Sequence, residues 1–534
     1  MKRALLVGGI VIGVALTCHL CFSWMGFTPT DEGFTLAHSR RILDGQVPHR
    51  DFIIIRPFFS PLLHVPEVWL GGASTLWLSR LIVWFQFACL AAAWTLVCNR
   101  LTNRSFSPAA AFFCGLICFA ATVHTKHLTA WHTIDGLFFL FVGLTFCIQP
   151  KTSAKLAGYF LLGLAPLCKQ GFVFVVPGAL LLLHDWRSIK YWGAGALPGF
   201  LYLAFLLFAG GVSDAATQLT SHQEFLSTAI LAYCQPRILL AAGIGFCAAH
   251  LINSEATNGV RRWSALIILY LAPFTGTTIS LARGTMISNA FLLFGLCLGI
   301  AAYGSVFHQD SPASKRVLSL ALLAAWTASM SGGYNSPALG AGALLVALAV
   351  TVLDQGPRLQ RRLIEYSLPG FCALIVAAFV VGRVQHIYRD QTATHLDRPI
   401  GDVMPGGNGI YTNPNTHAFL SDLQRAVAFV EQSHRKYAII PDVAAYWVQS
   451  PQANPFPAVW PHGGELKTPP LLNRYLRAID AGRIDTTVIV QKVAADNLAN
   501  GFVPLPEGSY YEVVRYVRRN LEKVHETDYF VLYQ

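Results

Sequence analysis

The stretch that decides the fold is ALLVGGIVIGVALTCHLC, residues 4–21, followed closely by PTDEGF, residues 29–34. The first run is long and apolar enough to enter a bilayer. Asp31 and Glu32 then place two adjacent carboxylates beside that bilayer, where a charge is costly unless it faces water, a cation or a substrate. The pair is either a functional site or part of a solvated loop, because acidic residues are also favoured where a helix begins.

The composition is that of a polytopic membrane protein. Of the 534 residues, 54% are hydrophobic and 13% are charged, and soluble domains carry about twice that share of charge. The formal net charge of +11 is concentrated in the first part of the chain, with 25 Lys and Arg against 13 Asp and Glu before His386, and 14 against 15 from His386 onward. Because the basic residues lie in short loops, as cytoplasmic anchors do, we expect no nucleic-acid partner.

The cysteines and the amino terminus indicate neither a disulfide scaffold nor a removed leader. All 12 cysteines lie at or before Cys372, mostly in apolar runs, where cysteine behaves as a small buried hydrophobe. No CxxC pair is joined by a second such pair, so no zinc site is predicted. Met1-Lys2-Arg3 and the following apolar run could form a signal peptide, but no small-x-small cleavage site follows. We therefore expect an uncleaved first span.

Apolar runs predict about thirteen transmembrane spans, several of them near the lower length limit. The predicted spans are 4–24, 76–98, 108–123, 133–149, 156–168, 172–184, 191–211, 237–253, 264–281, 285–303, 316–331, 337–353 and 367–385. Basic residues mark alternate loops: Lys2 and Arg3, Arg100 and Arg104, Lys151 and Lys155, Arg187 and Lys190, Arg261 and Arg262, Lys315 and Arg316, and Arg358, Arg361 and Arg362. This alternation predicts an α-helical polytopic membrane protein with a cytoplasmic amino terminus and a last span that ends outside.

The first outside loop, residues 25–75, is too long for a simple connection. It carries two apolar runs, Phe52–Ile55 and Phe58–Leu63, which are broken by Pro57 and Pro61. An interfacial helix that lies on the bilayer fits this pattern better than disorder.

Residues 386–534 have the composition of a soluble domain, also placed outside by the alternation of the loops. Helices predicted at 424–433, 471–481 and 511–521 alternate with strands predicted at 437–440, 486–490 and 529–533. This order indicates a small α/β domain with a partly parallel sheet. The glycines at 406–409 predict a turn rather than a phosphate cradle, and the Pro- and Trp-rich stretch 447–461 is predicted to be irregular and able to pack over the membrane face.

Three patches of the membrane half resemble a known family. The first is Asp31-Glu32-Gly33-Phe34 with Arg41-Ile42-Leu43-Asp44-Gly45 and Val47-Pro48-His49-Arg50-Asp51-Phe52. The second runs from Leu162-Gly163-Leu164-Ala165 to Lys169-Gln170-Gly171, and the third is His132-Thr133-Ile134-Asp135-Gly136-Leu137. Together they resemble the GT-C membrane glycosyltransferases, in particular the bacterial branch related to protein O-mannosyltransferases and the lipid A aminoarabinose transferase. The tail resembles nothing that we can name.

The resemblance implies a GT-C-like transmembrane glycosyltransferase domain, residues 1–385, and a periplasmic α/β domain, residues 386–534, in a bacterial inner membrane. Such enzymes take a sugar from a polyprenyl-phosphate donor and pass it to a lipid, glycan or protein acceptor on the outer face, among membrane lipids. They need no nucleotide site, and the sequence shows neither a GxGxxG pattern after a strand nor a P-loop. We expect no cofactor.

The resemblance and the chemistry of sugar transfer suggest a role for each of four acidic residues. Asp31 is the family-matched candidate for the base that takes a proton from the acceptor. Glu32 either assists Asp31 or fixes the loop, and the second role is the one that we favour. Asp51 either contacts a sugar hydroxyl or caps the apolar run after it. Asp135, near the outer end of a span, is costly unless paired. We expect it to belong to the substrate-binding site, with Lys126 or Lys169 as its partner.

A cation is needed where charge develops on the departing phosphate. Lys169 is the first choice, against the alternative of a lysine that extends to the interface. Arg283 is the second candidate, against the alternative of an ordinary membrane anchor. Arg56 and Arg50 of the first loop can also reach the phosphate, and nothing in the sequence ranks them.

Three histidines, at 124, 127 and 132, raise the question of a metal. Histidines at a membrane surface are more often interfacial polar residues, and the branch that the chain resembles includes metal-independent members, so we expect no metal. The main alternative function is a transporter or flippase of a lipid-linked substrate. Transporters commonly show repeated halves and charges near the middle of spans, whereas no repeat is visible here. A third possibility is an inactive relative.

Overall fold

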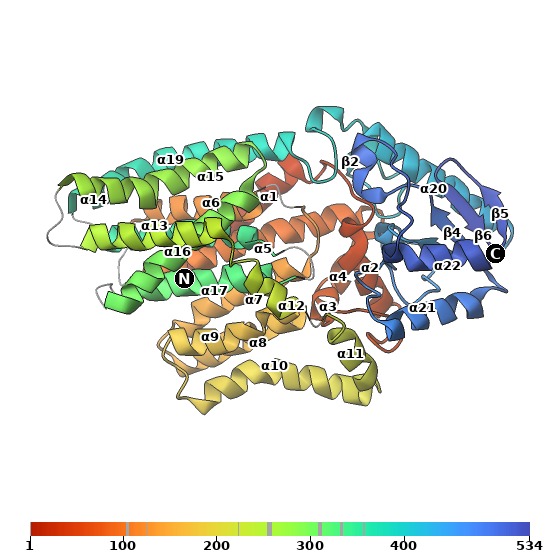
Figure 1. Ribbon diagram of the computed structural model, residues 1–534, viewed down its shortest axis with the longest axis horizontal. Coiled ribbons are helices and arrows are strands. Elements are labelled where there is room, and N and C mark those ends of the chain that lie inside the picture. The colour runs from red at the N-terminus through yellow and green to blue at the C-terminus, as the bar shows by residue number, and fades with distance from the viewer. Residues whose placement is uncertain are drawn as a thin grey trace.

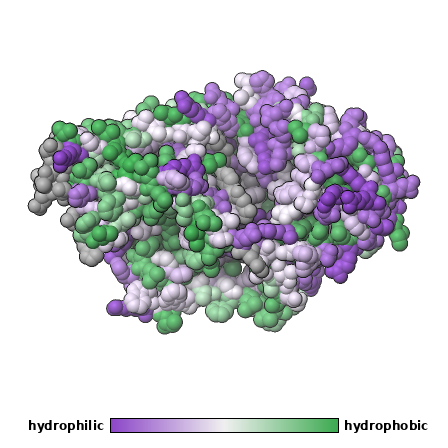
Figure 2. Space-filling model, viewed as in Figure 1, coloured by the Kyte–Doolittle hydropathy of each residue, from purple (hydrophilic) through white to green (hydrophobic). Residues whose placement is uncertain are grey.

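The computed structural model describes residues 2–102, 106–124, 127–222, 224–253, 259–307, 312–331, 335–355 and 358–534. A bundle of long helices forms one end of the molecule, and a smaller domain of helices and strands forms the other (Figure 1). Hydrophobic residues gather over the helical end of the visible face and hydrophilic residues over the other end (Figure 2). This division matches the change in composition at residue 386.

The helical end consists mainly of apolar helices, several of them long. They are α1 (Lys2–Phe22), α5 (Thr75–Leu101), α6 (Pro108–Val123), α7 (His132–Cys147), α8 (Thr152–Cys168), α9 (Val175–Leu182), α10 (Ile189–Phe208), α13 (Pro236–Asn253), α14 (Gly259–Leu266), α15 (Ala272–Ala282), α16 (Met286–Phe307), α17 (Pro312–Ser329), α18 (Ala341–Gln355) and α19 (Arg358–Gln385). Among the described residues, 6 helices are long and apolar enough to cross a membrane, or up to 7 if one bent pair is a single span. Five apolar helices of 10–17 residues are shorter. All the predicted spans fall on helices, whereas their number as membrane crossings stays a prediction.

Small residues let these helices approach closely, as is common between membrane helices. A Cβ at Gly299 of α16 would lie 1.9 Å from the carbonyl oxygen of Ala242 in α13. Only glycine therefore fits at this crossing. Contacts at the far end, such as the 2.7 Å ion pair of Lys155 with Asp185, join the loops that the sequence assigns to the cytoplasm.

The first loop is ordered as three short helices, α2 (Asp31–Leu43), α3 (Phe59–Leu63) and α4 (Val65–Gly71). The prediction of an interfacial helix is wrong for Phe52–Ile55, which is not helical and is buried. Its backbone is held by tertiary contacts instead, because Ile53 N donates to Pro457 O at 2.6 Å.

The C-terminal domain has three layers. Its sheet has the order β3-β4-β6-β5, with β3 (Lys436–Ile440) parallel to β4 (Thr486–Gln491), whereas β6 (Phe530–Tyr533) is antiparallel to β4 and to β5 (Lys523–Glu526). The helix α20 (Pro414–Gln432) packs on one face through a cluster that includes Phe419 and Ile489. The helices α21 (Pro469–Gly482) and α22 (Glu512–Asn520) cover the other face through Tyr475 and Val517. The helices and strands predicted here, and the partly parallel sheet, are confirmed; β5 and the short pair β1 (Arg398–Pro399) and β2 (Tyr411–Thr412) were not predicted.

The C-terminal domain sits directly on α2, which is buried along most of its length. A Cβ at Gly33 would lie 2.0 Å from Cα of Ala445 in the short helix η6 (Ala444–Val448). Beyond Val448 the Pro- and Trp-rich stretch is irregular, as predicted, and Trp460 places its ring 5.6 Å from that of Phe34. The start of α2 is therefore enclosed between the two halves.

Candidate active site

Asp31 is the first residue of α2 and lies at the junction of the two halves. Tyr388 OH donates to its Oδ2 at 2.8 Å, and Nη1 of Arg389 lies 3.2 Å from the same oxygen. Neither contact reaches Oδ1, which accepts no hydrogen bond among the described residues, and the side chain is 11% exposed. One oxygen is thus fixed and the other is left available.

Tyr388 and Arg389 follow directly after α19. Arg389 has a φ of 53°, a left-handed conformation that is uncommon for a residue with a side chain. The same Nη1 also lies 2.6 Å from Oδ1 of Asp496, in the short helix η7 (Ala495–Asn500) of the C-terminal domain. Arg389 therefore connects the first loop, the end of the membrane half and the C-terminal domain.

Glu32 has a different environment from its neighbour. Arg80 of α5 holds it with two hydrogen bonds, Nε to Oε1 at 2.6 Å and Nη2 to Oε2 at 2.8 Å. Arg80 also donates to the carbonyl oxygens of Ser23 and Gly26, in the turn that leads into α2. This geometry suits a residue that fixes the loop.

Asp135 lies in the first turn of α7 and is fully buried. It accepts from Ser60 Oγ and from Gln86 Nε2, the latter at 2.7 Å, and His64 Nε2 lies 3.1 Å from its Oδ1. The other ring nitrogen of His64 bonds to Glu67. No contact that we observe joins Asp135 to Lys169, and the other expected partner, Lys126, lies outside the described residues. Among the described residues, the first loop folds back and pairs this acid through Ser60 and His64.

The two first-ranked candidates for phosphate binding have different environments. Lys169 is buried at the end of α8, where its Nζ donates to Thr133 Oγ1 at 3.1 Å and to the carbonyl oxygen of Ala328 at 2.9 Å. Arg283 is exposed at the end of α15, next to Gly284, which packs against His386.

Two further candidates of the first loop contact their neighbours. Arg56 pairs with Glu465 of the C-terminal domain at 2.8 Å and lies over the ring of Phe34. Asp51 is exposed and pairs with Arg50, which lowers the pKa of Asp51 below its usual value. Arg56 thus lies beside α2, whereas Asp51 faces solvent.

The C-terminal domain adds groups that the sequence did not single out. Asp442 follows the parallel strand β3, at the edge where such sheets commonly bind ligands. It accepts from Trp460 Nε1 at 2.6 Å, and burial raises its pKa to about 7. His462 lies near Asp31 and Glu465, and burial lowers its pKa to about 4 although these acids act against it. Acids and aromatic rings from both halves therefore surround the start of α2.

No group of three or more His, Cys, Asp or Glu within the described ranges is placed to hold a metal ion. The expected absence of a metal stays a prediction.

The sequence offers little indication that Arg389, His462 and Asp442 belong to the site. The one local pattern is Tyr388-Arg389-Asp390, a polar triplet that follows the last apolar run.

No protein-family model and no curated protein matches the chain. Among solved structures, the chain is similar to a crystal structure of ArnT from Cupriavidus metallidurans bound to undecaprenyl phosphate, at 12% sequence identity and a TM-score of 0.45. The match covers 100% of this chain and 98% of that chain. At this identity, we transfer no residue role from that structure.

Proposed function

We propose that this protein transfers a sugar from a polyprenyl-phosphate donor to an acceptor molecule, and that Asp31 is the base in this reaction. The observation that carries the proposal is the state of the Asp31 carboxylate, with Oδ2 held by Tyr388 and Arg389 and Oδ1 left to accept a proton. Asp31 also lies where apolar helices meet a polar domain, so a lipid-linked donor and a polar acceptor can both approach it.

The reaction follows from this placement. An acceptor hydroxyl or amine attacks the anomeric carbon of the donor sugar, and its proton passes to Oδ1 of Asp31 as the new bond forms. The bond between the anomeric carbon and the phosphate oxygen breaks, and the lipid phosphate leaves with the electron pair. Glu32 holds the loop through Arg80 rather than taking part.

A cation near the departing phosphate stabilises the developing charge. We keep Lys169 as the first candidate, because it is buried near the outer end of the helices. The next residue, Gln170, donates through its side chain to Ile55 O in the first loop at 2.7 Å. Arg283 and Arg56 remain candidates of lower rank, and Asp51 and Asp135 are proposed to support the sugar and the loop, respectively.

The placement in a membrane follows from the motif resemblance and the alternating basic loops. We propose a multi-pass protein of a bacterial inner membrane, with the first loop and residues 386–534 in the periplasm and the active site on that face.

The test is sugar transfer by the purified full-length protein in lipid nanodiscs. The nanodiscs are incubated with a pool of polyprenyl-phosphate donors, whose sugar is radioactively labelled, and with a cell-envelope extract. The radioactivity that appears in the acceptor fraction is measured. We expect transfer by the wild type and by Asp485→Asn, a solvent-exposed acid paired with Lys436, and none by Asp31→Asn. If label never leaves the lipid but crosses the bilayer of vesicles that contain the folded protein, the chain is a flippase and the proposal is wrong.

A further inference from the structure

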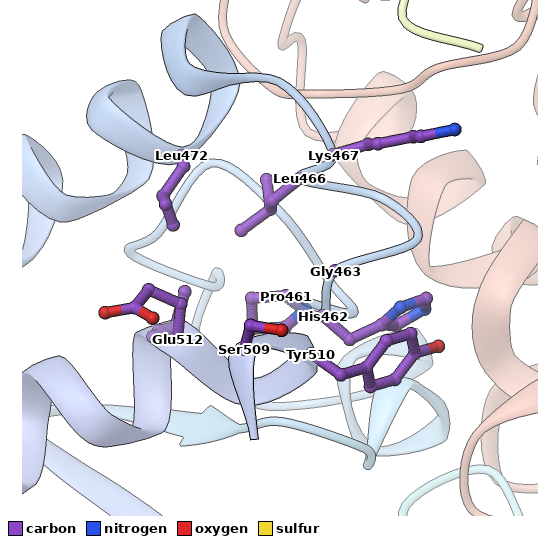
Figure 3. Close-up of a pocket in the computed structure, with 10 residues that line it drawn as sticks. Pro461, His462, Gly463, Leu466, Lys467, Leu472, Ser509, Tyr510 and Glu512 are labelled. Atoms are coloured by element: carbon purple, nitrogen blue, oxygen red, sulfur yellow. The ribbon is translucent and has the colours of Figure 1, made fainter.

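A cavity of about 420 Å³ lies in the C-terminal domain (Figure 3). Its walls come from the loop Pro461–Lys467, from the stretch Ser509–Val513 that leads into α22, and from Leu472 of α21. A backbone hydrogen bond from Gly463 N to Tyr510 O, at 2.7 Å, joins the two stretches. The cavity is therefore built by fixed backbone and is large enough for a small ligand.

His462 links this cavity to the start of α2. It lines the cavity, is only 6% exposed, and lies next to Trp460, whose ring is 5.6 Å from that of Phe34 in α2. Its ring stacks on that of Tyr510 at 4.8 Å and meets the ring of Trp460 edge-on at 4.3 Å. In Figure 3 the imidazole and the Tyr510 ring lie together at one end of the cavity.

The imidazole of His462 has an N–H group whose hydrogen bond is not made. Its Nδ1 accepts a hydrogen bond from Gly464 N at 2.9 Å, so the ring proton lies on Nε2. This Nε2 is buried and has no hydrogen-bond partner within the described part of the chain. Buried donors of this kind are rare in folded proteins. A ligand oxygen that reached this position would satisfy the donor.

The lining has the character of a carbohydrate site rather than of a phosphate site. Apolar groups and both kinds of charged group are present: Leu466, Leu472, Val513, Tyr510, Ser509, Glu512 and Lys467. Lys467 is the one cation of this lining, and it already lies 3.2 Å from Glu224. The half-exposed ring of Tyr510 offers an apolar face, and the hydroxyl and carboxylate beside it can bond to sugar hydroxyls.

The cavity also lies at the junction of the two halves. His222 of the membrane half contacts the carbonyl oxygen of Gly464 at 2.8 Å, and Glu224 pairs with Lys467 in the same loop. A molecule seated in the cavity would therefore lie close to the stretch of the membrane half that carries His222 and Glu224.

We propose that this cavity is the acceptor subsite and binds a pyranose ring of the acceptor, with Tyr510 as the stacking platform and Nε2 of His462 as a hydrogen-bond donor. The acceptor is thereby a glycan or a glycolipid. This assignment rests on the proposed function, because only a transfer reaction gives the bound sugar a role as acceptor.

The proposed acceptor subsite is tested by measuring sugar binding and sugar transfer separately. The full-length protein in nanodiscs is titrated with the methyl glycosides of glucose, galactose, mannose and N-acetylglucosamine, and saturation-transfer NMR reports contact. We expect at least one glycoside to bind the wild type, and its affinity to fall about tenfold or more in Tyr510→Ala, since an aromatic platform is lost. Ser509→Ala is a second, milder variant that removes one hydroxyl.

The matched control is Phe429→Ala. Phe429 is 39% exposed and stacks on His525 at 4.0 Å, beside a different cavity of the same domain. The Phe429→Ala variant should bind glycosides as tightly as the wild type does. In the transfer reaction, Tyr510→Ala should raise the KM for the acceptor with little change in kcat.

The outcomes separate the two proposals. If no glycoside binds the folded wild type, or if Tyr510→Ala binds as tightly as Phe429→Ala, the subsite is overturned even if transfer occurs. If glycosides bind through Tyr510 but no donor is ever used, the subsite stands as a sugar-binding site and the proposed transfer fails.

Discussion

Nη1 of Arg389 lies 3.2 Å from Oδ2 of Asp31. The two residues come from opposite ends of the membrane half, and the same guanidinium group reaches Asp496 in the C-terminal domain. The site therefore exists only when the first loop, the end of α19 and the C-terminal domain are assembled.

Replacing Arg389 with Met removes the cation beside Asp31. Nη1 of Arg389 helps to hold Oδ2 of Asp31, so without it the carboxylate loses a contact that orients Oδ1 toward the acceptor. We expect kcat/KM at neutral pH to fall about tenfold. The measurement is the transfer rate at neutral pH, with Arg398→Met as the control, since Arg398 is exposed and pairs only with Asp397 among the described contacts. Equal rates for the two variants would show that Arg389 does not act on the base.

Glu32→Gln should destabilise the protein more than Asp31→Asn does. Removing one member of a buried ion pair costs about 3–5 kcal/mol, because the other charge stays buried, and Arg80 would be that charge. We expect a clearly lower melting temperature for Glu32→Gln in detergent, and a melting temperature close to that of the wild type for Asp31→Asn. A Glu32→Gln variant that melts like the wild type but transfers no sugar would instead make Glu32 part of the chemistry.

Asp135→Asn should loosen the first loop, because it removes the charge that faces His64 and weakens the contacts to Ser60 and Gln86. We expect faster proteolysis between residues 25 and 75 and a loss of stability of roughly 3 kcal/mol. Lys169→Met should leave proteolysis of this loop unchanged and raise the KM for the donor about tenfold. The reverse pattern would place Asp135, rather than Lys169, at the donor.

Asp442 should make the stability of the protein depend on pH. Burial raises its pKa to about 7 in the folded protein, above the ordinary value of 3.8. Between these values the folded state binds more protons than the unfolded state, so stability falls as pH rises from 4 to 7, on the order of 2–4 kcal/mol. Asp442→Asn should remove this slope in melting temperatures measured across that range. A slope that persists in the variant would assign it to another group.

The helices and most strands could be predicted because each is marked by a local pattern. Apolar runs marked the apolar helices of the helical end, and Lys436–Ile440 and Thr486–Gln491 are short apolar runs bounded by polar residues. The edge strand Lys523–Glu526 has the sequence KVHE, too polar to signal a strand. Phe52–Ile55 gave the wrong expectation because its contacts, to Pro457 and Gln170, come from distant parts of the chain.

The candidate site was predictable only in part. Asp31 and Glu32 stand out as acids beside an apolar run, but their different partners, Arg389 and Arg80, could not be assigned from spacing. His64 escaped notice for the same reason, since only the folded loop brings it to Asp135.

The most direct measurement is the single-turnover rate of sugar transfer by Asp31→Asn, with donor binding to the same variant measured separately. Asparagine keeps the size of the side chain but cannot take the proton. The account predicts a rate at least a hundredfold lower with donor affinity close to that of the wild type. A rate within a few fold of the wild type, at equal donor occupancy, would contradict the role of Asp31 as the base.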